Sequence, residues 1–176
     1  LYHHRTAAAG DPYLLQSLFR FDSRARLDAF RDALQAVIDR HDILRTAMAW
    51  EGLAEPVQVV WRRAQLQIEE IALDPASGAI AAQLQARVEP RTRRLDVRRA
   101  PLLRLSCARD GADGSWVGAL QFHHMALDHT ALEVVQREMQ AFLHGEMAGL
   151  PETAPYRDYV VQATLAQSQA THEAFF

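Results

Sequence analysis

Apolar positions in the first part of the chain predict a strand followed by an amphipathic helix. Residues 13–21 have the composition of a strand, and this segment ends at Asp22 and Ser23, either of which can cap a helix. Beyond them, apolar side chains recur at helical spacing: Leu27, Phe30, Leu34, Val37 and Ile38. We therefore expect a helix that lies on a hydrophobic core.

The middle of the chain combines two short strand patterns with a second helix pattern. Residues 57–61 and 66–71 are predicted strands. Asp74 followed by Pro75 predicts a helix start, because aspartate caps a first turn and proline is tolerated in it. Pro90 predicts the end of that helix.

A hairpin is predicted in the second half of the chain. Residues 101–108 and 116–122 are strand candidates, and the loop between them contains two Asp-Gly pairs. In the second strand, Trp116, Leu120 and Phe122 share one face at a period of two. We expect these two strands to pair in antiparallel fashion.

Two further helices are predicted after the hairpin. Thr130 and Glu133 have the spacing of a capping box, and a last helical segment covers residues 156–176. The apolar face of the first of these helices consists of Leu132, Val135, Met139, Phe142 and Leu143. The order of elements predicts one domain of the α/β or α+β class, with a mixed, mostly antiparallel sheet backed by helices.

Composition and charge narrow the functional classes. Hydrophobic residues make up 49% of the 176 residues, enough for the core of one domain. A net charge of −3 and a pI near 6.2 argue against nucleic-acid binding, and no apolar run approaches the length of a membrane span. Without a visible secretory signal, we expect a cytoplasmic protein.

Side chains that can carry chemistry are concentrated between the hairpin and the helix after it. His123, His124, Asp128 and His129 lie within seven residues at this strand-to-helix junction. Because side chains alternate along a strand, we expect the two adjacent histidines on opposite faces. One imidazole can then face a cavity while the other is structural.

Three interpretations of this cluster stay open on the residues alone. Imidazole exchanges protons near neutral pH, which suits proton transfer at a rigid junction. His124, Asp128 and His129 resemble part of the His-x-His-x-Asp-His signature of metallo-β-lactamase-like hydrolases. Ala126 stands where that signature needs a second histidine, so we expect no metal site. In the third interpretation Asp128 is a helix-start carboxylate and the histidines are satisfied core residues.

Other polar groups give weaker predictions. His3 and His4 lack converging partners, and the single cysteine, Cys107, is expected to be a core residue. Five arginines between residues 91 and 99 favour a solvated loop over a phosphate-binding patch. Arg45, in an apolar context, is expected to be partly buried and to need a carboxylate partner.

Three motifs together resemble a known family. His123-His124-Met-Ala-Leu-Asp128 resembles the His-His-x-x-x-Asp-Gly motif of condensation domains in nonribosomal peptide synthetases, which are similar in fold to chloramphenicol acetyltransferase. Residues 40–46, Arg-His-Asp-Ile-Leu-Arg-Thr, resemble the family's Arg-His-Glu-x-Leu-Arg-Thr motif. Residues 156–161, Tyr-Arg-Asp-Tyr-Val-Val, resemble Tyr-x-Asp-Phe-Ala-Val. The three motifs stand in the family's order and span nearly the whole chain.

The resemblance implies an acyltransferase-type enzyme that forms a peptide bond. In the family, the second histidine, here His124, positions or deprotonates the amine of a carrier-bound acceptor, which attacks a carrier-bound thioester. The resemblance gives Asp128 a structural role with Arg45 as its ion-pair partner, and His123 the role of shaping the loop. It implies no bound cofactor, because the substrates arrive on phosphopantetheine arms. The implied partners are donor and acceptor peptidyl carrier proteins and an adjacent adenylation domain.

The chain also departs from the family pattern. His129 replaces the usual glycine after the aspartate and adds a side chain near the tunnel. The resemblance implies a domain of two lobes, and we expect residues 1–176 to be its N-terminal lobe, without the C-terminal lobe. Heterocyclisation domains carry aspartates at the two histidine positions of the motif. The presence of His123 and His124 in this chain therefore argues against heterocyclisation. An epimerisation domain, or a catalytically inactive docking or scaffold lobe of a megasynthase, stays an alternative.

Overall fold

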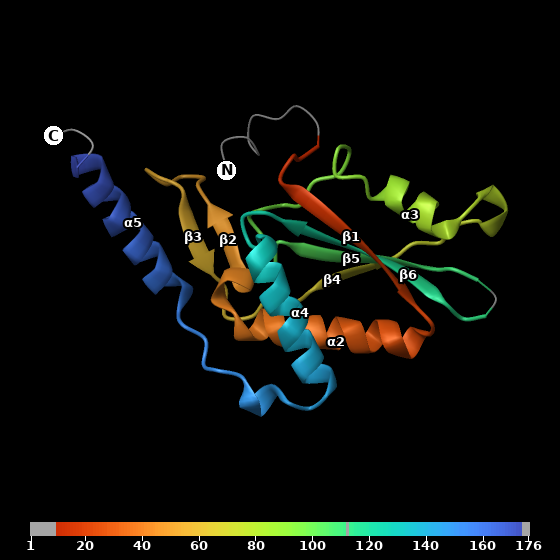
Figure 1. Cartoon of the computed structure of the whole chain (residues 1–176). Helices are drawn as coiled ribbons and strands as arrows, with labels where there is room; N and C mark the ends of the chain where they lie inside the picture. Colours follow the sequence, from red (N-terminus) through yellow and green to blue (C-terminus); the bar gives the residue numbers. More distant parts are fainter. Residues whose placement is uncertain (1–9, 112, 174–176) are drawn as a thin grey trace.

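The predicted hairpin forms the centre of the observed sheet (Figure 1). The computed structural model describes residues 10–111 and 113–173. Four strands lie in the order β1-β6-β5-β4; β6 is antiparallel to both neighbours, and β4 is parallel to β5. A separate antiparallel pair is formed by β2 and β3. The strands are β1 (Leu14–Phe21), β2 (Thr46–Ala49), β3 (Val57–Val60), β4 (Gln67–Glu70), β5 (Leu103–Arg109) and β6 (Trp116–His123).

Helices cover both faces of this sheet (Figure 1). The α-helices are α2 (Arg24–Arg40), α3 (Ile80–Arg87), α4 (His129–Leu143) and α5 (Tyr156–Glu173). α2 and α4 pack together on one face, and α3 covers the other. The mixed α/β architecture with a mostly antiparallel sheet is therefore as predicted.

The alternation of side chains along β6 divides the core between the two faces. Leu120 and Phe122 pack against α2 and α4, while Val117 and Ala119 pack against α3. Glycine is needed at position 118, because a Cβ atom there would lie 2.9 Å from a ring carbon of Phe21. The central strand is thus buried on both sides, which makes its end a rigid place for a functional group.

The start of α2 agrees with the sequence, but the start of α3 does not. Ser23 caps α2 by accepting a hydrogen bond from the backbone N–H of Arg26 at 3.3 Å. Asp74 and Pro75 open only a short 3₁₀ turn (Pro75–Ser77), because Gly78 adopts a φ of 117° that no helix continues. The prediction that α3 begins at Asp74 was therefore wrong; its first residue is Ile80.

Two remaining expectations have simple outcomes. His3 and His4 lie outside the described residues. Among the residues that the structure describes, no helix is both long and apolar enough to cross a membrane.

Candidate active site

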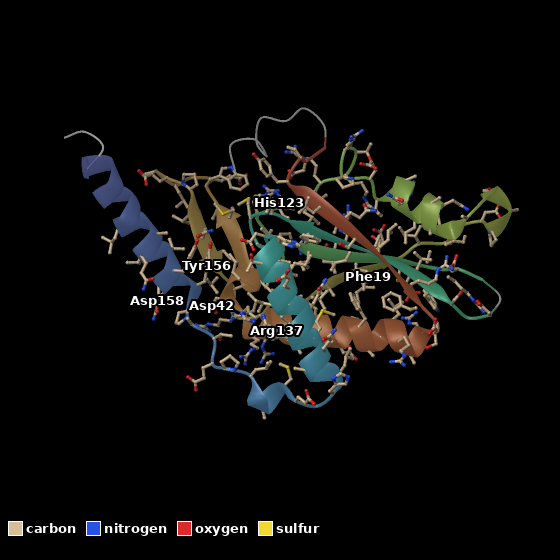
Figure 2. All side chains as sticks on the ribbon, in the orientation of Figure 1. Phe19, Asp42, His123, Arg137, Tyr156 and Asp158 are labelled. Atoms are coloured by element: carbon tan, nitrogen blue, oxygen red, sulfur yellow. The ribbon has the colours of Figure 1, made fainter. Side chains whose placement is uncertain are left out.

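His123, labelled in Figure 2, is the last residue of β6, and His124 follows it. Backbone hydrogen bonds join both residues to the segments just before β1 and β5. The N–H of His123 donates to the carbonyl of Leu102 at 3.0 Å, and the N–H of His124 donates to the carbonyl of Tyr13 at 2.8 Å. A tight turn follows, in which the N–H of Ala126 donates to the His123 carbonyl at 2.9 Å. Both imidazoles therefore project from well-defined backbone.

His123 is a buried structural residue. Its side chain is 1% exposed, and its Nδ1 accepts a hydrogen bond from the N–H of Met125 at 3.1 Å. Because Nδ1 is the acceptor, the proton of the neutral ring sits on Nε2, which donates to the buried carboxylate of Asp11 at 3.1 Å. Tyr13 stacks on the ring with 6.4 Å between centroids. These contacts leave His123 as support for the loop.

His124 has the opposite arrangement. Its side chain is exposed, and its Nδ1 lies 3.0 Å from the carbonyl oxygen of Leu127. A carbonyl can only accept, so Nδ1 carries the proton and Nε2 of the neutral ring holds a free lone pair. The two histidines therefore lie in different environments, as their alternation predicted, and His124 offers a general base.

Asp128 caps α4. Its carboxylate accepts a hydrogen bond from the N–H of Ala131 at 2.7 Å, and the helix begins at His129. The capping box predicted at Thr130 and Glu133 was therefore wrong, because a capping residue two positions earlier closes the first turn. Asp128 has the helix-start role that one interpretation of the cluster gave it.

Arg45 is partly buried as expected, with a side chain that is 13% exposed, but its partner differs from the expected one. Its guanidinium pairs with Asp42 at 2.7 Å and donates to the carbonyl of Trp61. Asp42 lies one turn earlier in the same 3₁₀ segment (Asp42–Arg45), so a local carboxylate meets the charge. The expected ion pair between Arg45 and Asp128 is wrong for this structure.

His129 is a solvent-exposed residue at the first position of α4. Its side chain is 90% exposed, and its Nε2 lies 3.5 Å from the carboxylate of Glu133.

Within the described residues, no group of three or more histidine, cysteine, aspartate or glutamate side chains is arranged to hold a metal ion.

Cys107 lies in the core and is fully buried. Burial raises the pKa of its thiol to about 11, because the interior disfavours the thiolate. The neighbouring Ser106 donates a hydrogen bond to Glu69 at 3.3 Å. Neither side chain has the surroundings of a nucleophile.

Sequence reasoning missed three parts of the site. Asp11 is 112 residues from His123, the Leu127 carbonyl is a backbone group, and Glu138 joins α4 to the motif at residues 40–46. No local pattern could reveal the first and third contacts, since folding alone brings the partners together. For the second contact, the strand-to-helix junction predicted at the histidine cluster was the available signal.

Comparisons with known proteins agree with this fold. A family model described as Condensation domain matches residues 1–175. Malpinin synthetase of Mortierella alpina is 47% identical over 176 residues, which are 100% of this chain and 2% of that protein. The chain therefore spans a small fraction of this relative.

Two solved structures share the architecture. The EpoB cyclization-docking bidomain, from a nonribosomal peptide synthetase of Sorangium cellulosum, matches with a TM-score of 0.73 and 21% identity over 96% of this chain and 34% of that chain. The starter condensation domain of rhizomide synthetase matches with a TM-score of 0.70 and 16% identity, over 99% of this chain and 45% of that chain.

Proposed function

The chain belongs to the condensation-domain family of nonribosomal peptide synthetases, and from this premise we propose that His124 serves amide-bond formation between two carrier-bound substrates. The donor is an acyl or peptidyl thioester and the acceptor an aminoacyl thioester, each on the phosphopantetheine arm of a peptidyl carrier protein. The observation that carries the proposal is the orientation of the His124 ring.

The hydrogen bond from Nδ1 to the Leu127 carbonyl fixes both the ring and its tautomer. The exposed Nε2 can then accept a hydrogen bond from an amine, or its proton, as the amine nitrogen attacks the thioester carbonyl. A C–N bond forms, the C–S bond breaks, and the departing thiolate takes up a proton. Because the thioester is already an activated acyl group, whose reaction with an amine releases free energy, the reaction needs no further cofactor.

In this proposal residues 1–176 are the N-terminal lobe of the domain. The match to 45% of the starter condensation domain supports this division. The lobe supplies His124 and the rigid strand end that holds it, and a C-terminal lobe would form the opposite wall of the site. An adjacent adenylation domain would load the acceptor carrier protein.

The test measures the intact mass of an acceptor carrier protein after incubation with a loaded donor carrier and the complete domain. We expect a mass gain equal to the donor acyl group with the wild type and none with His124→Ala. His144→Ala is the matched control, because His144 is an exposed histidine just after α4. Circular dichroism would check that each variant is folded.

Other outcomes would contradict the proposal. Equal product from wild type and His124→Ala would remove this histidine from the chemistry. No product from the folded wild type would favour the inactive scaffold lobe, and exchange of the donor's α-proton without product would favour epimerisation.

A further inference from the structure

A buried carboxylate joins the C-terminal end of α2 to the middle of α4. The side chain of Glu138 is 8% exposed, and its Oε2 accepts a hydrogen bond from Nε of Arg40 at 3.1 Å. The same oxygen lies 2.8 Å from Nε2 of His41. A carboxylate at this depth is costly unless it is paired, so the two helices are held at the separation that these contacts require.

Arg40 also reaches the segment that follows α4. Its guanidinium donates to the carbonyl of Pro151, and its own carbonyl accepts a hydrogen bond from the hydroxyl of Thr153 at 3.3 Å. The residue therefore joins three parts of the chain: α2, α4 and the segment leading to α5. Loss of the Glu138 charge would loosen this junction.

Glu138 lies on the face of α4 that meets α2. Ala131 and Val135 precede it at helical spacing and, with Leu127, line one side of a cavity of about 130 Å³. The other side is lined by His41 and residues 43 and 44 of the 3₁₀ segment. This cavity is open to solvent, so fewer apolar contacts hold the N-terminal half of α4 against the 3₁₀ segment than a closed core contact would provide.

Leu127, whose carbonyl orients His124, is one of the residues that line this cavity. The side chain of Leu127 is in the core with Leu44, and its carbonyl accepts the hydrogen bond from Nδ1 of His124. A shift of α4 relative to α2 would move Leu127 and would lengthen this bond. The ring of His124 would then be free to rotate and to exchange tautomers.

We propose that Glu138 is a positioning residue for His124: its charge holds α4 against Arg40 and His41 and so keeps the Leu127 carbonyl in place. This inference rests on the proposed function for its catalytic consequence. Its structural part, the tautomer of His124, is independent of any activity.

The experiment uses the complete domain and the variants Glu138→Gln and Glu133→Gln. Glutamine keeps the shape of Glu138 but removes its charge, and Glu133 is the control because it lies on the same helix with a side chain that is 66% exposed. ¹⁵N spectra of histidine-labelled protein report which ring nitrogen carries the proton, and His124→Ala assigns the signal. Steady-state kinetics with carrier-bound acceptor give kcat and KM.

We expect the wild type and Glu133→Gln to show Nδ1-protonated His124, and Glu138→Gln to show a mixture of tautomers. In the same variant kcat should fall on the order of tenfold with little change in KM, because ring orientation and not substrate binding is affected. If Glu138 only stabilised the fold, Glu138→Gln would lower the melting temperature but leave the tautomer of His124 unchanged.

An unchanged tautomer in folded Glu138→Gln, or the same change in Glu133→Gln, would overturn the inference. If Glu138→Gln does not fold, Arg40→Gln replaces it, since it removes the cation that pairs with Glu138; a tautomer identical to wild type in the folded variant would then overturn the inference. If the wild-type domain makes no amide, the proposed function fails while the tautomer measurement still decides the role of Glu138.

Discussion

Two adjacent histidines have different environments because the backbone alternates at the end of β6. His123 is protonated on Nε2 by virtue of its contacts with Met125 and Asp11, whereas His124 is protonated on Nδ1 by its contact with Leu127. The backbone places the ring of His123 in the core, and the Nδ1–H tautomer of His124 leaves that exposed residue with a basic Nε2. Under the proposed function, the pair would therefore separate structural support from chemistry within two residues.

The contribution of the Asp11–His123 hydrogen bond to the stability of the fold can be measured by replacing Asp11. We expect Asp11→Ala to lower the free energy of unfolding by about 1–3 kcal/mol, because the buried Nε2–H of His123 and the N–H of Tyr13 lose an acceptor. Urea unfolding of the complete domain checks this. Asp32→Ala is the control, since Asp32 pairs with Arg31 at the surface and should cost less than about 1 kcal/mol. Equal losses would contradict the role of Asp11.

Burial of Cys107 makes stability depend on alkaline pH. Its pKa is raised to about 11 from 9.0, so the folded state holds the thiol proton more tightly than the unfolded state. The free energy of unfolding should therefore fall as the pH rises from 9 through 11, and Cys107→Ala should lack this contribution. Urea unfolding at pH 8, 9.5 and 10.5 tests the slope. A wild type and variant that lose stability in parallel would refute the assignment.

At the scale of elements, the sequence predicted those strands and helices whose signal is local. Alternation along residues 116–122 and helical spacing after Ser23 identified β6 and α2, because one buried face imposes each period. The starts of α3 and α4 were misplaced, since the φ of Gly78 and the competition between Asp128 and Thr130 for the cap are decided by backbone geometry.

The capping role of Asp128 makes a prediction that an ion pair would not share. Asp128→Asn should leave stability nearly unchanged, because the amide oxygen can accept from the N–H of Ala131, while Asp128→Ala should cost about 1 kcal/mol. Thermal unfolding of both variants gives the comparison. If Asp128 were paired with Arg45, asparagine and alanine would be about equally costly.

The candidate site was predicted in its centre but not in its contacts. The motif identified His124 and its neighbours, since they are consecutive in sequence. Asp11 and Glu138 were not predicted, because their partners are 112 and 98 residues away and no periodicity marks them. The expected partner of Arg45 was wrong because Asp42, three residues earlier in the chain, forms the ion pair with the guanidinium.

At the scale of the whole molecule, the described chain leaves substantial apolar surface open. A groove of about 230 Å³ runs between β1 and α4, lined by Phe19, Phe30 and Met139 among others. Leu18 on the edge strand and Leu143 at the end of α4 are 41% and 51% exposed. His124 is exposed as well, so water has access to the nitrogen that the proposed chemistry uses.

This open site predicts that residues 1–176 alone form no amide from loaded carrier proteins. A base in contact with water cannot exclude hydrolysis of the thioester or orient two substrates, and both tasks need a second wall. The measurement is the intact mass of the acceptor carrier after incubation with the 176-residue chain, beside the complete domain at equal concentration. Circular dichroism and a cooperative unfolding transition would establish that the shorter chain is folded. Product from the folded chain alone would contradict the division into lobes and would place the whole catalytic apparatus within these residues.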